Sequence, residues 1–555
     1  MNEQTEERLS KRNLYAFSFG TVGRDMAYTL FSGYIMSFIL FTRVLTAQQF
    51  SVITALIIVA RIIDAMNDPL MGGIIENTRT KWGKFKPWIM IGVVTNAAVL
   101  IMLFFSKLQG WDFIYLLIAV YILFDITFTM NDIGYWAMMP SLTSHPEDRN
   151  RLASLATLCA GIGAALATAA IPTFTAGDMQ LGNGGAATAY KWITAIIVFF
   201  FIGCQIMTSV LVKEKPLPPF EKQPHFSFKK VFRVVRKNDQ LLWISIVFLI
   251  NNVAQSVLTG GLAMMYIYFN FGYQGFLYMV YSILFGAAGL FVMMTYPKFS
   301  GKYSRKQLMK AGMVLIIIGH GLLALSGLLM PVGLGSIGNL DLKFIALMIC
   351  NAIYGGGQIL IYMVLTISIT NTVEYNEWKT GDREESIIFA LRPLTAKFGS
   401  ALMQLVIWLV YLGIGILNNT NGIAVAEQNA DQGLYLRAAE GYSALELFTE
   451  YGAKDMAEAT RLFDRAQELL AVGDKKVVDI ADILKSEIIE GVIEGVKNGQ
   501  KIALVICMAV IPVVLALCAY FMYKSKYFID EKKYDEMLAD IKAKAEATAS
   551  ASAEQ

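Results

Sequence analysis

The run PWIMIGVVTNAAVLIMLFFSK, residues 87–107, is separated by four residues from the run DFIYLLIAVYILFDITFTMNDIGYWAMM, residues 112–139. Each run is mostly apolar and is long enough for a helix that crosses a bilayer, which needs about 20 residues. Similar runs recur along the 555-residue chain, which is 55% hydrophobic and 16% charged. Soluble domains are about one quarter charged. The sequence therefore predicts an all-α polytopic membrane protein.

Twelve apolar segments are expected to cross the membrane in two six-helix bundles, the arrangement of many transporters. They lie near residues 14–44, 50–75, 87–107, 112–139, 152–174, 190–212, 240–270, 273–296, 309–330, 342–372, 387–418 and 501–523. The predicted domains are an N-terminal bundle at 1–212, a middle loop at 213–239, a C-terminal bundle at 240–523 and a tail at 524–555. Residues 419–500 are an insertion between the last two spans, and their apolar spacing predicts an amphipathic helical hairpin.

Basic residues predict the orientation of these segments. Lys and Arg gather in the N-terminal tail, in the middle loop and in one set of short loops, such as RTKWGKFKPW at 79–88. The opposite short loops and helix edges hold Arg43, Lys107, Lys191 and Lys343. By the positive-inside rule, both tails and the middle loop are cytoplasmic and residues 419–500 lie outside. The expected location is the inner, or plasma, membrane.

Several function classes are disfavoured by composition. The net charge is +3 and the basic residues are scattered, so no nucleic-acid partner is expected. The five cysteines lie in apolar stretches without CxxC spacing, and the three histidines are far apart. No nucleophile–base pair or metal cluster supports an enzyme, and no cofactor is expected.

Acidic residues inside the predicted spans are the candidate functional groups, because each costs on the order of 3 kcal/mol at the bilayer centre. They are Asp25, Asp64, Asp68, Asp125 and Asp132. Asp64 and Asp68 are four residues apart and share one helix face, and Asn67 can add an amide oxygen there. Asp125 and Asp132, seven residues apart, also share a face.

Carboxylate, amide and hydroxyl oxygens, the last from Thr129, suit a hard cation and not a soft transition metal. A sodium ion or a proton is the expected ligand. The alternative is that the acids form buried ion pairs with Arg61, Arg392 and Lys397. The nearby rings of Tyr135, Trp136 and Tyr362 would suit stacking on a sugar face, although packing or lipid contact explains any one of them alone.

Three motifs carry a resemblance to a known family. They are ARIIDAMNDPLMGGIIENTRTKWGKFKPW at residues 60–88, MNDIGYW at 130–136 and TVEYNEWKTGDREES at 372–386. The chain resembles the glycoside–pentoside–hexuronide:cation symporter family of the major facilitator superfamily, over roughly residues 14–417 and the last span. The resemblance implies coupled uptake of a sugar or glycoside with sodium, lithium or protons by alternating access.

The same resemblance implies roles for particular residues. The family's cation ligands match Asp64, Asn67, Asp68 and Thr129, with Asp132 at the junction of the cation and sugar sites. Its sugar-binding acid, stacking tryptophan and cavity lysine match Asp25, Trp136 and Lys397. The best-known member differs from this chain at four sugar-site positions, which are here Thr157, Tyr362, Asn371 and Arg392. The expected sugar contacts are thus Asp25, Asp132, Trp136, Tyr362, Arg392 and Lys397, and Arg392 would allow an anionic sugar.

The resulting hypothesis is a monomeric symporter whose partners are a sugar or glycoside, a monovalent cation and the lipid bilayer. Two alternatives stay open. A sodium-coupled lysolipid transporter of the same superfamily would use Arg392 and Lys397 to bind a headgroup. A membrane sensor would bind sugar without transporting it.

Overall fold

The computed structural model describes residues 8–143, 145–214, 228–337, 339–382, 384–472 and 475–553. Contacts divide the chain into two compact units. The first contains Met1–His225, Ile267–Val280 and Tyr411–Gln500, and the second contains Phe226–Tyr266, Tyr281–Val410 and Lys501–Gln555. The division passes through several long helices, so that some helices contribute one end to each unit.

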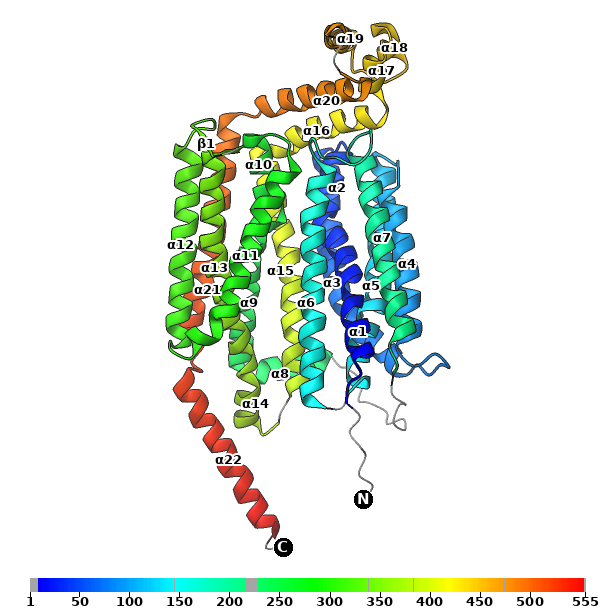
Figure 1. Ribbon diagram of the computed structural model, residues 1–555. Helices are drawn as coiled ribbons and strands as arrows, with labels where there is room; N and C mark the ends of the chain where they lie inside the picture. The colour runs from blue at the N-terminus through cyan, green and yellow to red at the C-terminus, as the bar shows by residue number, and fades with distance from the viewer. Residues whose placement is uncertain are drawn as a thin grey trace. The chain divides into compact units, whose positions relative to one another are not determined.

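Long helices from the N-terminal part of the chain dominate the first unit (Figure 1). They are α1 (Lys11–Tyr28), α2 (Tyr34–Thr42), α3 (Ala47–Glu76), α4 (Lys86–Phe104), α5 (Gly110–Met138), α6 (Pro146–Thr175) and α7 (Ala186–Leu211). A π-helical turn, Thr29–Gly33, joins α1 to α2, and a 3-10 turn, Met139–Ser141, follows α5. Thr46 caps α3 by a reciprocal capping box with Gln49, which satisfies exposed backbone donors at the start of the helix.

The second unit is built mainly from the C-terminal helices. They are α8 (Phe228–Lys237), α9 (Asp239–Val257), α10 (Ala263–Phe271), α11 (Gly275–Ser300), α12 (Arg305–Leu329), α13 (Leu342–Thr370), α14 (Thr372–Thr380), α15 (Glu385–Ile414), α21 (Asn498–Lys526) and α22 (Glu531–Ala553). A π-helical turn, Leu258–Leu262, joins α9 to α10, and the short strands β1 (Ser336–Ile337) and β2 (Leu340–Asp341) pair antiparallel. Of the predicted middle loop, residues 228–237 form α8, and 215–227 lie outside the described residues.

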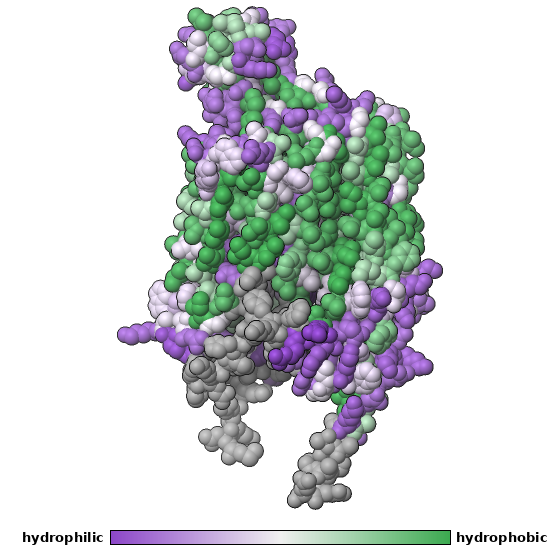
Figure 2. Space-filling view, turned by 180° about the vertical axis from the view of Figure 1, so that it is seen from behind, coloured by the Kyte–Doolittle hydropathy of each residue, from purple (hydrophilic) through white to green (hydrophobic). Residues whose placement is uncertain are grey.

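Eleven helical stretches among the described residues are long and apolar enough to cross a membrane. The remaining predicted span, residues 14–44, is helical from Lys11 to Thr42 but is more polar, since it carries Arg24 and Asp25. Hydrophobic residues cover the middle of the long helices and hydrophilic residues gather near their ends (Figure 2), as expected for helices in a bilayer. The all-α, twelve-span fold class is confirmed.

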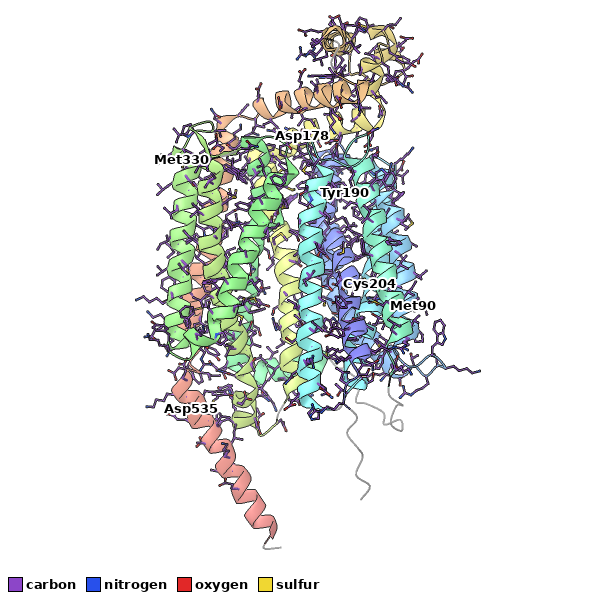
Figure 3. All side chains as sticks on the ribbon, in the orientation of Figure 1. Met90, Asp178, Tyr190, Cys204, Met330 and Asp535 are labelled. Atoms are coloured by element: carbon purple, nitrogen blue, oxygen red, sulfur yellow. The ribbon has the colours of Figure 1, made fainter. Side chains whose placement is uncertain are left out.

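The insertion differs from the predicted hairpin. It contains five helices, α16 (Ile416–Asp431), α17 (Leu434–Ala439), α18 (Ala444–Thr449), α19 (Met456–Ala471) and α20 (Val477–Glu494). They enclose a small core that includes Leu434, Leu462 and Ile480. Glycines at 433, 441 and 452 adopt positive φ and turn the chain between these helices, which apolar spacing alone does not reveal. Within the first unit, α16 and α20 lie near Asp178 of the loop between α6 and α7 (Figure 3).

Glycines let α1 pack closely against α6 and α7. A Cβ added to Gly163 on α6 would lie 2.2 Å from the Val22 carbonyl oxygen of α1. A Cβ on Gly23 of α1 would lie 2.5 Å from the Phe200 carbonyl oxygen of α7. Small residues at such crossings are how membrane helices achieve close packing, and here they hold α1 in the centre of the unit.

We expect Gly163→Ala to lower stability by about 1–3 kcal/mol, because the added methyl overpacks the contact with α1. Gly161→Ala, on the same helix, is the matched control, since a Cβ added at Gly161 would meet no other atom within 4 Å. Melting temperatures of the purified variants in detergent test the prediction. Equal melting temperatures for the two variants would contradict this packing.

Candidate functional site

Arg24 of α1 joins two of the predicted acidic residues. Its Nη2 atom lies 2.6 Å from Asp25 Oδ2, and its Nη1 atom lies 2.9 Å from Asp132 Oδ1 on α5. The Arg24 side chain is 4% exposed, whereas those of Asp25 and Asp132 are 23% and 33% exposed. The guanidinium is thus buried behind two carboxylates that remain accessible to a ligand.

Aromatic rings enclose the same guanidinium. The Arg24 Cζ atom lies 4.9 Å from the Trp136 ring centroid and 5.2 Å from that of Tyr135. Phe17 stacks on Tyr135 with ring centroids 4.4 Å apart. These cation–π contacts stabilise a buried positive charge. They also fix Trp136, the predicted sugar-stacking ring, beside Asp132.

Two of the predicted cation ligands, Asp68 of α3 and Thr129 of α5, meet across the two helices. The Thr129 hydroxyl donates to Asp68 Oδ1 at 3.4 Å. Asp64 is 8% exposed and Thr129 is 3% exposed. The half-buried Asn67 has a buried amide Nδ2 for which the described residues provide no hydrogen-bond partner. Because an amide can present its oxygen after a half-turn, this position offers a further oxygen ligand.

The donor set suits a monovalent ion better than a transition metal. Within the described ranges, no three His, Cys, Asp or Glu side chains gather in a way that could hold a metal ion. Asp68 and Thr129 pair a carboxylate with a hydroxyl oxygen, and Asp64 and Asn67 carry further oxygens on α3. Such all-oxygen surroundings with low charge are what a hard, weakly charged cation requires.

Arg61 forms a second centre of positive charge in the first unit. It is 8% exposed, and its charge interacts with the carboxylates of Asp125 and Asp64. The ion-pair alternative thus applies to part of the acidic set. Among the other basic residues considered from sequence, Arg392 and Lys397 belong to the second unit.

Arg24 is the residue of the candidate site that the sequence analysis missed. It directly precedes Asp25, but its pairing with Asp132 links residues more than one hundred positions apart. The sequence signal was that Arg24 and Asp25 are the only charged residues between positions 14 and 42 of the first span. An arginine at such a position requires a carboxylate partner, so the signal was available.

In the second unit, the structure brings together two of the three predicted sugar contacts. Arg392 Nη2 donates to the Tyr362 hydroxyl at 2.6 Å, and the Arg392 Cζ atom lies 5.5 Å from the Tyr362 ring centroid. Arg392 is exposed and Lys397 is half-buried. Tyr362 packs on Phe248 of α9, with ring centroids 5.5 Å apart, which holds its hydroxyl toward Arg392.

Comparisons with known proteins identify the class of the molecule. The described residues form helices long and apolar enough to cross a membrane, and a family described as "MFS/sugar transport protein" matches residues 16–436. The chain belongs to this family. The family consists of transporters and not of enzymes, as predicted.

Relatives are named for the transport of sugars. The raffinose carrier protein of Pediococcus pentosaceus is 29% identical over 70% of this chain, and this chain spans only 60% of that protein's length. A lactose permease of Lactobacillus helveticus is 26% identical over 88% of this chain and 74% of its own. The isoprimeverose transporter of Lactiplantibacillus pentosus is 23% identical over 73% of this chain and 81% of its own. These relatives confirm the resemblance to the glycoside–pentoside–hexuronide:cation symporter family.

Solved structures confirm the fold. A D-xylose–proton symporter superposes with a TM-score of 0.52 at 12% identity, covering 75% of this chain and 96% of its own. A bacterial homologue of the human lysosomal transporter Spinster superposes with a TM-score of 0.53 at 13% identity, covering 94% of this chain and 99% of its own. At this level of identity the likeness concerns only the chain fold.

Replacing Arg24 by Gln is expected to destabilise the protein by about 3–5 kcal/mol, since two carboxylates would lose their buried partner. Adding Asp25→Asn and Asp132→Asn to that variant should recover much of the loss. Arg12→Gln, at an exposed position of the same helix, is the control. Thermal unfolding of the purified variants measures the effect, and an Arg24→Gln protein as stable as the control would contradict the assigned triad.

Proposed function

We propose that this protein imports a sugar or glycoside together with a sodium ion or a proton, by alternating access. One observation carries the proposal. Helix α5 bears Thr129, bonded to Asp68 of α3, and three residues later Asp132, paired with Arg24 of α1. Trp136 follows four residues further, so all three side chains share one face of α5.

That shared face gives a physical route for coupling. A cation among Asp64, Asn67, Asp68 and Thr129 lowers the repulsion between carboxylates and fixes the position of α5. Asp132 and Asp25 then accept hydrogen bonds from sugar hydroxyls, while Trp136 stacks on the sugar ring. Each ligand favours the arrangement of α5 that the other needs. The cation therefore raises the affinity for sugar by the same factor by which sugar raises the affinity for the cation.

Electrostatics supports a positively charged cosubstrate. Away from the helix ends, α1, α3 and α5 hold five aspartates (Asp25, Asp64, Asp68, Asp125 and Asp132) and two arginines, Arg24 and Arg61. A monovalent cation reduces this negative excess. Moving one positive charge inward releases about 2.3 kcal/mol per 100 mV, which corresponds to roughly fifty-fold accumulation of a neutral sugar.

The names of the relatives favour a neutral oligosaccharide as the substrate and do not favour a lysolipid or a sensor role. In the second unit, the proposed contacts with the sugar are Tyr362, Arg392 and Lys397. Because Arg392 is exposed and cationic, a hexuronide belongs in the panel of test sugars.

The proposed setting is the plasma membrane, with a monomeric protein and cytoplasmic termini. The basic loops support this orientation. Within the first unit, the start of α1 and the insertion lie at opposite ends of the helices (Figure 1), which agrees with an external insertion. We refer below to the end that carries the insertion as the outer end.

Uptake of labelled lactose, raffinose and a hexuronide into proteoliposomes tests the proposal. We expect an inward sodium or proton gradient to drive accumulation of at least one of these sugars above equilibrium. Sugar uptake that only equilibrates under both gradients would contradict coupling.

Asp68→Asn keeps the size of the side chain but removes its charge, and it should reduce gradient-driven accumulation at least tenfold. Asp112→Asn is the matched control, because Asp112 is exposed in the first turn of the same helix that bears Thr129. Initial rates and final sugar ratios in proteoliposomes measure the effect. Uphill accumulation by Asp68→Asn at the wild-type level would show that the cation site is misassigned.

A further inference from the structure

The insertion belongs by its contacts to the N-terminal helices, although the chain places it between α15 and α21. The first unit includes Tyr411–Gln500 together with the N-terminal helices. Three separate joints fasten the insertion to this unit. Neither the sugar site nor the cation site uses them.

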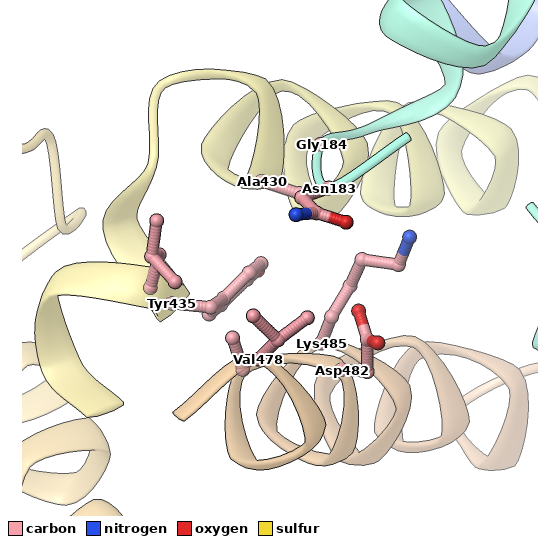
Figure 4. A pocket seen from close by; sticks show the side chains of 9 residues that line it. Asn183, Gly184, Ala430, Tyr435, Val478, Asp482 and Lys485 are labelled. Atoms are coloured by element: carbon pink, nitrogen blue, oxygen red, sulfur yellow. The ribbon is translucent and has the colours of Figure 1, made fainter. Parts of the chain in front are cut away.

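The first joint is a buried cluster of polar groups around Glu427 of α16. This side chain is 0% exposed, and it accepts hydrogen bonds from the Ala186 backbone N–H at 2.7 Å and from Gln180 Nε2 at 3.3 Å. Lys485 of α20 places its Nζ atom 3.5 Å from Glu427 Oε2 and also donates to Gln180 Oε1. Figure 4 shows Lys485 rising from α20 toward the loop that bears Asn183 and Gly184. Two helices of the insertion thus meet the α6–α7 loop through one ion pair.

Burial has a cost that these contacts offset only in part. Desolvation raises the pKa of Glu427, and the Asp431 carboxylate raises it further, whereas the Lys485 ammonium and the Gln180 and Ala186 donors lower it. Such a group is stable only while its partners stay in place. The backbones of the two surfaces are also in close contact, because a Cβ added to Gly185 would lie 1.9 Å from the Glu427 carbonyl oxygen. Separation of the two surfaces therefore breaks the whole cluster at once.

The second joint lies at the start of α7. Asp431, at the end of α16, accepts hydrogen bonds from the backbone N–H groups of Gly185, Ala187 and Thr188 at 3.0, 3.2 and 3.1 Å. The Thr188 hydroxyl donates to the same carboxylate. A carboxylate from the insertion therefore caps the N-terminus of a membrane-spanning helix, where it also interacts well with the helix dipole.

The third joint involves the loop between α2 and α3. Asn421 of α16 accepts from the Leu45 backbone N–H at 2.9 Å and donates to the Leu45 carbonyl oxygen at 2.8 Å. Gln428 donates to the Thr42 carbonyl oxygen at 3.0 Å. Helix α16 thus lies against two different connections of the N-terminal helices.

The links from the insertion to the spanning helices are short. Only Gly415 separates α15 from α16, and three residues separate α20 from α21. Gln500 donates to the carbonyl oxygens of Ile414 and Gly415 at 3.0 and 3.3 Å, which ties the two links together. One residue extends at most about 3.6 Å. The outer ends of α15 and α21 can therefore move only a few ångströms from the N-terminal helices before the three joints are strained.

We propose that residues 416–494 form a latch that must undock from α7, from the α6–α7 loop and from the α2–α3 loop whenever the transporter opens at its outer end. The inference rests on the proposed transport function. In alternating access the outer ends of the two bundles separate, and the short links transmit that separation to the docked insertion. The insertion therefore stabilises the state that is closed at this end and slows its opening.

A disulfide between Thr188→Cys and Asp431→Cys tests the latch, because these side chains are in contact at the second joint. In the reduced state the variant should transport sugar. After oxidation, transport should fall at least tenfold, and a reductant should restore it. The reduced sample serves as the folding control, since it is the same protein.

A matched control places the disulfide inside the insertion. Arg465 of α19 and Glu487 of α20 form an exposed ion pair at 2.8 Å, and Arg465→Cys with Glu487→Cys should leave transport unchanged after oxidation. Wild-type protein treated with the same oxidant controls for the five native cysteines, which are free thiols.

The outcomes separate the two hypotheses. Full transport by the oxidised Thr188→Cys/Asp431→Cys protein would overturn the latch and leave the transport function intact. No transport by wild type and control would contradict the proposed function instead. The Thr188→Cys/Asp431→Cys protein could already be inactive in the reduced state while wild type and the control variant transport sugar. In that case Leu45→Cys with Asn421→Cys repeats the test at the third joint, and full transport by this oxidised variant would overturn the latch.

Discussion

Arg24 holds the carboxylates of Asp25 and Asp132 together, and this ion triad is the contact on which the arrangement of α1 and α5 depends. A single carboxylate inside a membrane is costly, and two of them side by side would also repel each other. The buried guanidinium removes both problems and leaves the carboxylates partly exposed. The residues that stabilise the fold are therefore the same residues that keep carboxylate oxygens partly exposed on α1 and α5. The enclosing rings of Tyr135 and Trp136 keep the guanidinium in place.

Helix α5 links this triad to the carboxylates of α3. Thr129 bonds to Asp68, and Asp132 bonds to Arg24, within one turn of the same helix. A small shift of α5 changes both contacts together, because an α-helix moves as a rigid rod over one turn. This short link through α5 is sufficient for the proposed coupling between cation and sugar.

Much of the fold could be predicted from the sequence, because the apolar runs that cross a membrane are long and separated by charged loops. The predicted cation ligands could be placed on shared helix faces by their spacing, and the structure brings Asp68 and Thr129 together as expected. Spacing within one helix says nothing about partners on another, and for this reason Arg24 was missed. The five-helix insertion was also misjudged, since its turns depend on glycines with positive φ and its docking depends on contacts to distant loops. The predicted domain boundaries, the membrane orientation and the roles of the site residues stay predictions.

The central claim is that the acidic cluster of the first unit carries one positive charge inward with each sugar molecule. Electrical recording from proteoliposomes adsorbed to a solid-supported membrane tests it most directly, whichever cation is used. On addition of lactose or raffinose we predict an inward positive current in sodium buffer or, for a proton-coupled carrier, in sodium-free buffer as well. Sugar flux without any charge movement in both buffers would contradict the account.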